Sequence, residues 1–155
     1  MKEFFQKKLV QPILDLLKQG LTPEKLSASL AAGIVICCFP VIGLTTVLCL
    51  IFATIFRLNH VAIQLANYFS YPLQIALIIP FLHAGNWIFG VQRMQFNLDQ
   101  MVLHFKMDWL DFFKTYGAVA ARGCVAWLIF APLAFLVLYY PLKIILKTTS
   151  QNKRI

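Results

Sequence analysis

The chain has 155 residues, 60% of them hydrophobic, and a formal net charge of +8. The apolar fraction exceeds the roughly 45 to 50% of soluble domains, which excludes an ordinary water-soluble domain and indicates a protein that has the lipid bilayer as its solvent. The basic residues flank apolar stretches instead of gathering on one soluble face, so composition favours contact with anionic lipid headgroups over nucleic acid.

Residues 1–20 are expected to form an amphipathic helix on the cytoplasmic surface. Phe5, Leu9, Ile13 and Leu16 recur at near-helical spacing, with Lys and Gln between them. Such a pattern suits a helix that lies in the membrane interface. It suits a helix packed on the membrane domain equally well, so both placements stay open.

The membrane domain, residues 21–90, is expected to open with a well-marked helix start. Thr22 can serve as the N-cap, Pro23 suits the first turn, and Glu24 lies near the positive end of the helix dipole. We therefore expect an apolar helix to begin here.

The apolar stretch that follows is interrupted between Pro40 and Gly43. The runs on either side, 26–39 and 44–56, are both shorter than the about 20 residues that a spanning helix needs. Two half-length helices that enter and leave on the same side, a re-entrant hairpin, fit these lengths. The cations that flank the hairpin would then both face the cytoplasm, as the positive-inside rule prefers: Lys25 and Arg57.

Residues 61–90 are expected to form one kinked or broken crossing. Asn59 can cap the helix that follows it, and Tyr71-Pro72 and Pro80 interrupt the apolar run. Thirty helical residues would reach roughly 45 Å, which exceeds the about 30 Å hydrocarbon core. One crossing is therefore enough for this segment.

The last part of the chain is expected to hold three segments. Residues 91–115 balance acidic and basic side chains on an apolar helical pattern, which predicts an amphipathic interfacial segment on the outer side, either lying in the lipid or folded back on the membrane domain. Residues 116–141 form the final transmembrane helix, with Arg122 near its start and its guanidinium snorkelling to the interface. Residues 142–155 form a basic cytoplasmic tail.

These segments together predict an all-α polytopic membrane protein. It has a broken, re-entrant helical hairpin, two further membrane-crossing helices and amphipathic interfacial helices. Two crossings leave both basic termini in the cytoplasm.

Three short motifs carry a family resemblance. They are Pro40-x-x-Gly43-x-Thr45, then Arg57-Leu58-Asn59, then Tyr71-Pro72-Leu73. Over residues 21–90 the chain resembles the bacterial membrane family DUF2062, although that family usually has Asn before this last proline and Thr two residues after it. The resemblance implies a small multi-pass protein of the bacterial inner membrane, whose relatives are in some cases joined to glycosyltransferase domains. It implies no particular activity.

The interrupted hairpin is the candidate functional site. Backbone groups left unpaired at a helix break in hydrocarbon need protein or a wet cavity around them, and free N–H groups at the start of the second half-helix suit an anionic or hydroxylated group such as a lipid phosphate. The candidate ligand- or lipid-binding residues around it are Pro40, Gly43, Thr45, Thr46, Arg57, Asn59, Asn67 and Gln74.

A purely structural role stays open for each of these residues. The two threonines can cap a helix, Arg57 can anchor the hairpin by snorkelling, and the asparagines can hydrogen-bond neighbouring helices. We expect no catalytic residues, no metal and no cofactor. No carboxylate lies between residues 26 and 98, and the four cysteines lack ligand spacing.

Two functions follow as expectations. The first is transport or lipid handling with a site at the broken hairpin. The second is a non-catalytic scaffold or anchor for an envelope enzyme such as a glycosyltransferase. The expected partners are membrane lipids with anionic headgroups, together with a second copy of the chain or an envelope enzyme, and no nucleic acid.

Overall fold

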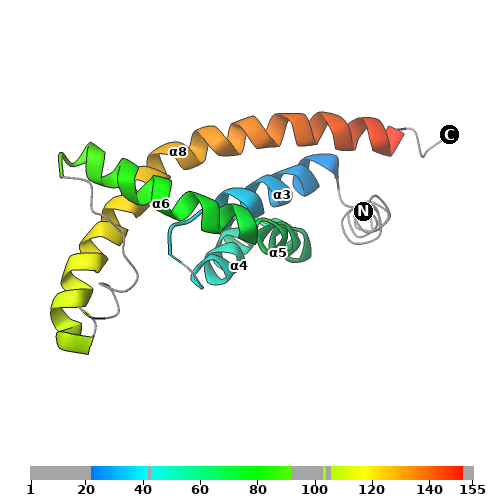
Figure 1. Cartoon of the computed structure of the whole chain (residues 1–155). Coiled ribbons are helices and arrows are strands. Elements are labelled where there is room, and N and C mark those ends of the chain that lie inside the picture. Colours follow the sequence, from blue (N-terminus) through cyan, green and yellow to red (C-terminus); the bar gives the residue numbers. More distant parts are fainter. Residues whose placement is uncertain (1–21, 42, 92–102, 104–105, 152–155) are drawn as a thin grey trace.

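The computed structural model describes residues 22–41, 43–91, 103 and 106–151. This part of the chain is helical and contains no strand, as the all-α prediction requires (Figure 1). Its helices are α3 (Pro23–Cys37), α4 (Thr45–Ile55), α5 (His60–Phe69), α6 (Tyr71–Ile88) and α8 (Trp109–Gln151). The predicted surface helix over residues 1–20 and most of the predicted interfacial segment 91–115 lie outside the described residues.

Helix α3 starts as its sequence predicts. Thr22 is the N-cap, and its hydroxyl accepts a hydrogen bond from the backbone N–H of Lys25 at 3.3 Å. Pro23 occupies the first helical position, where a missing N–H has no consequence. Two serines farther along donate to backbone carbonyls one turn back, so their hydroxyls are satisfied within the helix.

The predicted interruption separates α3 from α4. Pro40 follows the end of α3, and Gly43 has a φ of +87°, a conformation that side chains other than hydrogen rarely adopt. Open space surrounds the position that a Cβ on Gly43 would take. Glycine is therefore needed here for its backbone conformation and not for close packing.

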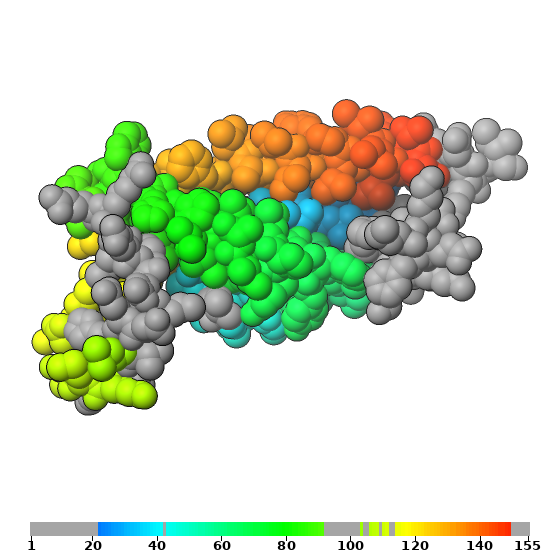
Figure 2. All heavy atoms as spheres, in the orientation of Figure 1, coloured from blue at the N-terminus to red at the C-terminus, as the bar shows by residue number. Residues whose placement is uncertain are grey.

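Helix α3 is the centre of the bundle. It packs against α5 on one side and α8 on another, and Figure 2 shows it visible only in a narrow gap between α8 and α6. Gly33 lets α5 approach, because a Cβ there would collide with the carbonyl oxygen of Ile63 and lie 2.7 Å from Cβ of Ala66. This is the small-residue contact that the composition of the helix favours.

Helices α3 and α8 run antiparallel. Leu26, near the start of α3, shares a buried cluster with Leu146, near the end of α8. At the other end of α3 the indole Nε1 of Trp127 donates to the carbonyl oxygen of Val35 at 3.0 Å. The first residues of α3 and the last of α8 therefore lie at the same end of the molecule.

The segment after residue 59 is broken, as predicted, at Tyr71-Pro72. Helices α5 and α6 meet at Ser70 with a bend of 67°. Asn59 is the N-cap of α5, and its side-chain oxygen accepts from the N–H of Ala62 at 2.8 Å. Pro80 lies inside α6 without ending it.

Helix α8 differs from the expected division at residues 116 and 142. It runs unbroken from Trp109 to Gln151, with Pro132 and Pro141 inside it. Good helix formers surround Gly117 and continue past Pro141, so neither residue ends the helix. Figure 1 shows the first turns of α8 pointing away from the bundle before the rest lies along α3.

Among the described residues, one helix is long and apolar enough to cross a membrane: the Lys114–Thr149 part of α8. The bent pair of α5 and α6 counts as a second crossing, or as a re-entrant loop, only when both helices are taken together, and α4 is a shorter apolar helix. Of the expected hairpin and two further crossings, the described residues thus contain one helix with the length and composition of a span, or two if the bent pair counts as one. Large apolar side chains are exposed along it, including Leu133 at 62% and Val137 at 62%.

Candidate functional site

Two glutamine amides brace the break between α3 and α4. Nε2 of Gln74, in the first turn of α6, donates to the carbonyl oxygen of Phe39 at 3.0 Å. Nε2 of Gln64, on α5, donates to the carbonyl oxygen of Thr46 at 3.0 Å. The two carbonyls flank the Pro40–Gly43 interruption. Gln74 supplies a donor to the Phe39 carbonyl, which lies past the end of α3 and has no helical partner, and Gln64 ties the start of α4 to α5.

The amides that surround this break keep unpaired oxygens. Oε1 of Gln64, Oε1 of Gln74 and Oδ1 of Asn67 are buried without a hydrogen-bond partner. Gln74 is 0% exposed and Asn67 is 1% exposed. A buried acceptor without a donor typically costs about 1–3 kcal/mol, so a water molecule or another donor would stabilise this region.

Thr45 and Thr46 lie at the start of α4 but do not cap it. The N-cap is Leu44, in a helical conformation, and it has no side-chain hydrogen bond. Thr45 is 2% exposed, and Thr46 takes part through its backbone carbonyl. Pro40 is buried as well, and Gln74 reaches the residue before it, Phe39, so these predicted residues lie at or next to the break.

Asn59 has a structural role at the other end of α4. Besides capping α5, it donates its backbone N–H to Oγ of Ser29 at 2.9 Å, which ties the α4–α5 connector to α3. Both its N–H and its side-chain oxygen are used within the fold.

Arg57 ends α4 in an unusual conformation. Its φ is +52°, its N–H donates to the carbonyl of Thr54 at 3.4 Å, and the next N–H, of Leu58, reaches the carbonyl of Ala53 at 2.9 Å. This pattern is a Schellman ending, in which the left-handed position is most often glycine. An arginine there costs roughly 1 kcal/mol or more in backbone energy. The residue at this position is therefore not the one that the backbone conformation favours, which is glycine.

Helix α4 therefore divides the predicted site. Thr45 and Arg57 lie at opposite ends of an 11-residue helix, about 16 Å apart along its axis. One group is the polar cluster at the break, and the other is an exposed cation at the α4–α5 connector. The two groups are close in sequence, but a helix of this length holds their side chains too far apart to contact one ligand group.

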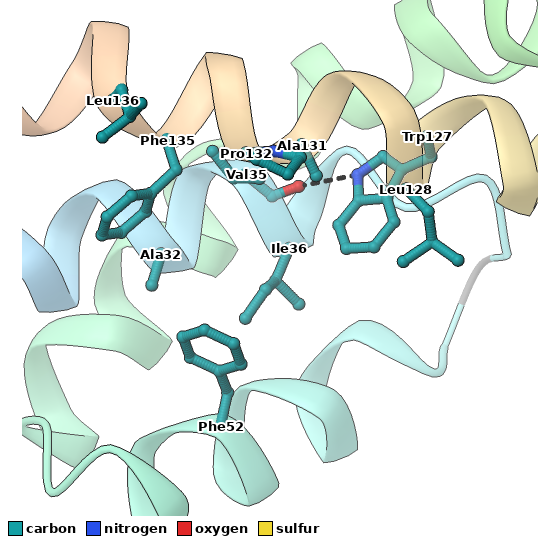
Figure 3. Close-up of a pocket in the computed structure, with 10 residues that line it drawn as sticks. All are labelled: Ala32, Val35, Ile36, Phe52, Trp127, Leu128, Ala131, Pro132, Phe135 and Leu136. Carbon is teal, nitrogen blue, oxygen red and sulfur yellow. Dashed lines mark hydrogen bonds between the residues drawn. The ribbon is translucent and has the colours of Figure 1, made fainter.

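An apolar groove lies between α4 and α8 (Figure 3). Its volume is about 430 Å³, and its floor is α3. In Figure 3, Phe52 of α4 faces Ile36 and the α8 side chains across the groove. The ten lining residues are all apolar or aromatic: Ala32, Val35, Ile36, Phe52, Trp127, Leu128, Ala131, Pro132, Phe135 and Leu136. We call this the α4–α8 groove.

A second apolar groove, of about 310 Å³, lies between α6 and α8. Trp127 and Ala131 line both grooves, so the indole stands between them. The ring of Phe39 meets this indole edge-on at 5.1 Å, and the Nε1 bond to Val35 fixes its position. The grooves are missing from the predicted site because helices far apart in sequence form them.

Aromatic and basic side chains extend the α4–α8 groove at one end. Phe135, which lines it, stacks on Tyr139 at 5.7 Å, and Nζ of Lys143 lies 5.8 Å from the Tyr139 ring centroid. On α4, Phe52 contacts the ring of Phe56 at 4.3 Å, and Arg57 follows directly. Two cations therefore lie beyond the lining residues in the chain direction: Lys143 within α8 and Arg57 just past the end of α4.

The described residues offer no metal site, since no group of three or more His, Cys, Asp or Glu side chains among them lies close enough to hold an ion. The cysteines are unpaired thiols on apolar helices. Cys37, Cys38 and Cys49 are buried, and Cys124 is half-buried.

No curated protein and no solved structure is significantly similar to the chain. A family model, described as an uncharacterized protein conserved in bacteria (DUF2062), matches residues 6–154. This match extends the resemblance of the three motifs over almost the whole sequence. The chain belongs to the bacterial DUF2062 family.

Proposed function

We propose that this protein is a lipid-binding protein of the bacterial inner membrane. In this proposal the α4–α8 groove holds an acyl chain of an anionic phospholipid, and Arg57 and Lys143 contact its headgroup. The observation that carries the proposal is the wholly apolar lining of the groove, continued at one end by aromatic side chains and cations.

The spacing of charges along α8 supports a membrane-spanning placement. Between Arg122 and Lys143 the helix carries no charged residue. At about 1.5 Å per residue that interval is about 31 Å long, close to the about 30 Å hydrocarbon core. The two cations would then lie at opposite interfaces.

With α8 placed across the membrane in this way, the positions of the other cations favour a multi-pass topology with both ends in the cytoplasm. Lys25 adjoins Leu26, which packs on Leu146, so it lies at the Lys143 end of the bundle. Arg57 lies at this end too, because Asn59, two residues farther along the connector, donates its backbone N–H to Ser29 near the start of α3. Cations at one end of three helices favour the cytoplasmic side. The α5–α6 pair would then cross outward and α8 would return.

The composition of the groove favours a lipid over a polar substrate. Each buried methylene contributes about 0.8 kcal/mol, so an acyl chain gains affinity from contact with an apolar lining alone. A phosphate needs cations or N–H donors, which the groove interior lacks and its basic end supplies. For this reason we propose binding of a lipid and assign no transport step or chemical reaction.

The exposed apolar face of α8 favours anchoring as a second candidate function. Three large apolar side chains of this 43-residue helix are more than half exposed: Leu128, Ile129 and Leu133. A partner helix, from a second copy or from an envelope enzyme such as a glycosyltransferase, would cover this face as well as lipid does.

Native mass spectrometry of the full chain, released from detergent in the presence of phosphatidylglycerol or phosphatidylcholine, tests the lipid proposal. The wild type should retain phosphatidylglycerol preferentially. Leu136→Trp, which fills the α4–α8 groove, should reduce retention, whereas Leu133→Trp, on the same helix but outside the groove lining, should not. Equal retention by all three proteins, or none by the wild type, would overturn the proposal. A homogeneous dimer without lipid would support anchoring.

A further inference from the structure

The crossing of α6 and α8 is built on two glycines. A Cβ on Gly85 would collide with the backbone of Arg122, and a Cβ on Gly123 would lie 2.8 Å from Cδ2 of Leu82. The two backbones therefore approach as closely as helices can. The neighbours of the glycines, Asn86 and Arg122, are brought together by this approach.

Asn86 and Arg122 form an incomplete polar pair. Nη1 of Arg122 donates to Oδ1 of Asn86 at 3.3 Å. Asn86 is 1% exposed, yet its Nδ2 has no hydrogen-bond partner. Among the described residues, the hydrogen-bond partner that the structure gives this guanidinium is thus a neutral amide.

The pair offers donors and a positive charge. The guanidinium carries five N–H donors and no acceptor, and the only acceptor of the Asn86 side chain is already used by it. A buried N–H without an acceptor destabilises the fold, and a cation between apolar helices is costly without a counter-charge. An anionic ligand with at least two acceptor oxygens would satisfy both groups at once.

We infer that Arg122 and Asn86 form an oxyanion site that binds a phosphate group. Its position supports this ligand class, because Arg122 lies about 31 Å along α8 from Lys143, at the level of the opposite headgroup layer. The phosphate comes either from a phospholipid in that layer or from free phosphate in solution. This site is separate from the α4–α8 groove, and its assignment to a lipid phosphate rests on the proposed membrane-spanning placement of α8.

The first variant that tests the site is Asn86→Asp. It keeps the shape of the side chain, replaces the unpaired N–H donor with a carboxylate oxygen and pairs Arg122 internally. Its binding of phosphate should fall by at least about tenfold, because a charge-assisted hydrogen bond is lost and a carboxylate faces the anion. Its melting temperature in detergent should equal or exceed that of the wild type, so the loss cannot be attributed to unfolding.

Arg122→Gln and Lys114→Gln complete the comparison. Arg122→Gln should also lose binding, whereas Lys114→Gln, which removes another cation of α8 beyond the crossing, should bind as the wild type does. The probes are phosphatidylglycerol, diacylglycerol as its phosphate-free match, and inorganic phosphate, each added to the full chain. Binding is read by native mass spectrometry for the lipids and by thermal shift for phosphate.

The outcomes separate the two sources. A preference for phosphatidylglycerol over diacylglycerol that is clearly weaker in Asn86→Asp than in the wild type assigns the site to a lipid phosphate. Stabilisation of the wild type, but not of Asn86→Asp, by inorganic phosphate alone assigns it to a free anion. If Asn86→Asp binds both probes as the wild type does, or if the wild type binds neither, the inference is wrong and the pair only joins the helices.

Discussion

Arg57 occupies the same backbone position at the end of α4 that Gly90 occupies at the end of α6. Their φ angles are +52° and +64°, and in both endings the following N–H returns to a carbonyl five residues back, Leu58 to Ala53 and Val91 to Asn86, at 2.9 Å. One ending has the residue that this conformation favours, and the other has a cation. The difference in backbone energy between arginine and glycine in this conformation is the loss of stability that comes with a guanidinium at this position.

Substitutions at these two positions should change stability in opposite directions. Arg57→Gly should raise the free energy of unfolding by about 1 kcal/mol because the left-handed conformation is easy for glycine. Gly90→Ala should lower it by about 1 kcal/mol, and open space around Gly90 excludes a steric contribution. Thermal unfolding in detergent, followed by circular dichroism, measures both.

Lipid binding should separate from stability at Arg57. Arg57→Ala keeps the strained conformation and loses the charge, whereas Arg57→Gly loses both. Both variants should retain less phosphatidylglycerol than the wild type, by severalfold, although one is less stable than the other. A variant that is stabilised and still retains lipid normally would show that Arg57 does not contact the headgroup.

The glycines of α3 and α8 provide a second matched pair. Gly33→Ala should destabilise the fold by about 1–3 kcal/mol, since its methyl group would collide with the Ile63 carbonyl and force α5 away. Gly117→Ala meets nothing within 4 Å and should stabilise α8 by about 0.5–1 kcal/mol. Equal effects of the two substitutions on thermal unfolding would contradict the close α3–α5 contact.

Local signals predicted much of the fold. The Thr22-Pro23 helix start, the turn at Gly43 and the bend before Tyr71-Pro72 are each encoded by adjacent residues, and the structure has all three. The prediction divided α8 at residues 116 and 142 and was wrong there. Gly117 and Pro141 are typical of helix ends, and the sequence does not show the packing that holds the helix together across them.

The candidate site was less predictable because its contacts connect distant residues. Gln74 reaches Phe39, Trp127 reaches Val35, and Arg122 meets Asn86 only after α6 and α8 are in place. Asn86 and Gln64 are polar residues within an apolar run, and the sequence alone gives no partner for either, so the predicted site does not include them.

Removal of the Gln74 amide should weaken the break between α3 and α4. Gln74→Leu leaves the Phe39 carbonyl without its donor in a buried environment and should cost about 1–3 kcal/mol of unfolding free energy. Gln74→Asn, one methylene shorter, should behave similarly because its amide falls short of the carbonyl. Phosphatidylglycerol retention should be unchanged in both folded variants, and a loss of lipid would instead place Gln74 in the binding site.

Cysteine labelling tests the proposed topology. In a chain whose four native cysteines are replaced, Thr148→Cys should react with a membrane-impermeant maleimide only when the cytoplasmic face is opened. Val91→Cys, just past the end of α6 and 40% exposed, should react in intact spheroplasts. Labelling of both positions from the same side would contradict the crossing of α8.

The central position of α3 has a consequence for biosynthesis. One flank of this helix is covered by α5, which follows it closely, but the other is covered by α8, which comes after α4, α5 and α6 in the chain. Until α8 has been synthesised, Leu26 and Val35 of α3 lack their α8 contacts, Leu146 and Trp127. Assembly of the bundle therefore needs α8 to insert, and a chain truncated before α8 should be a substrate for membrane quality control.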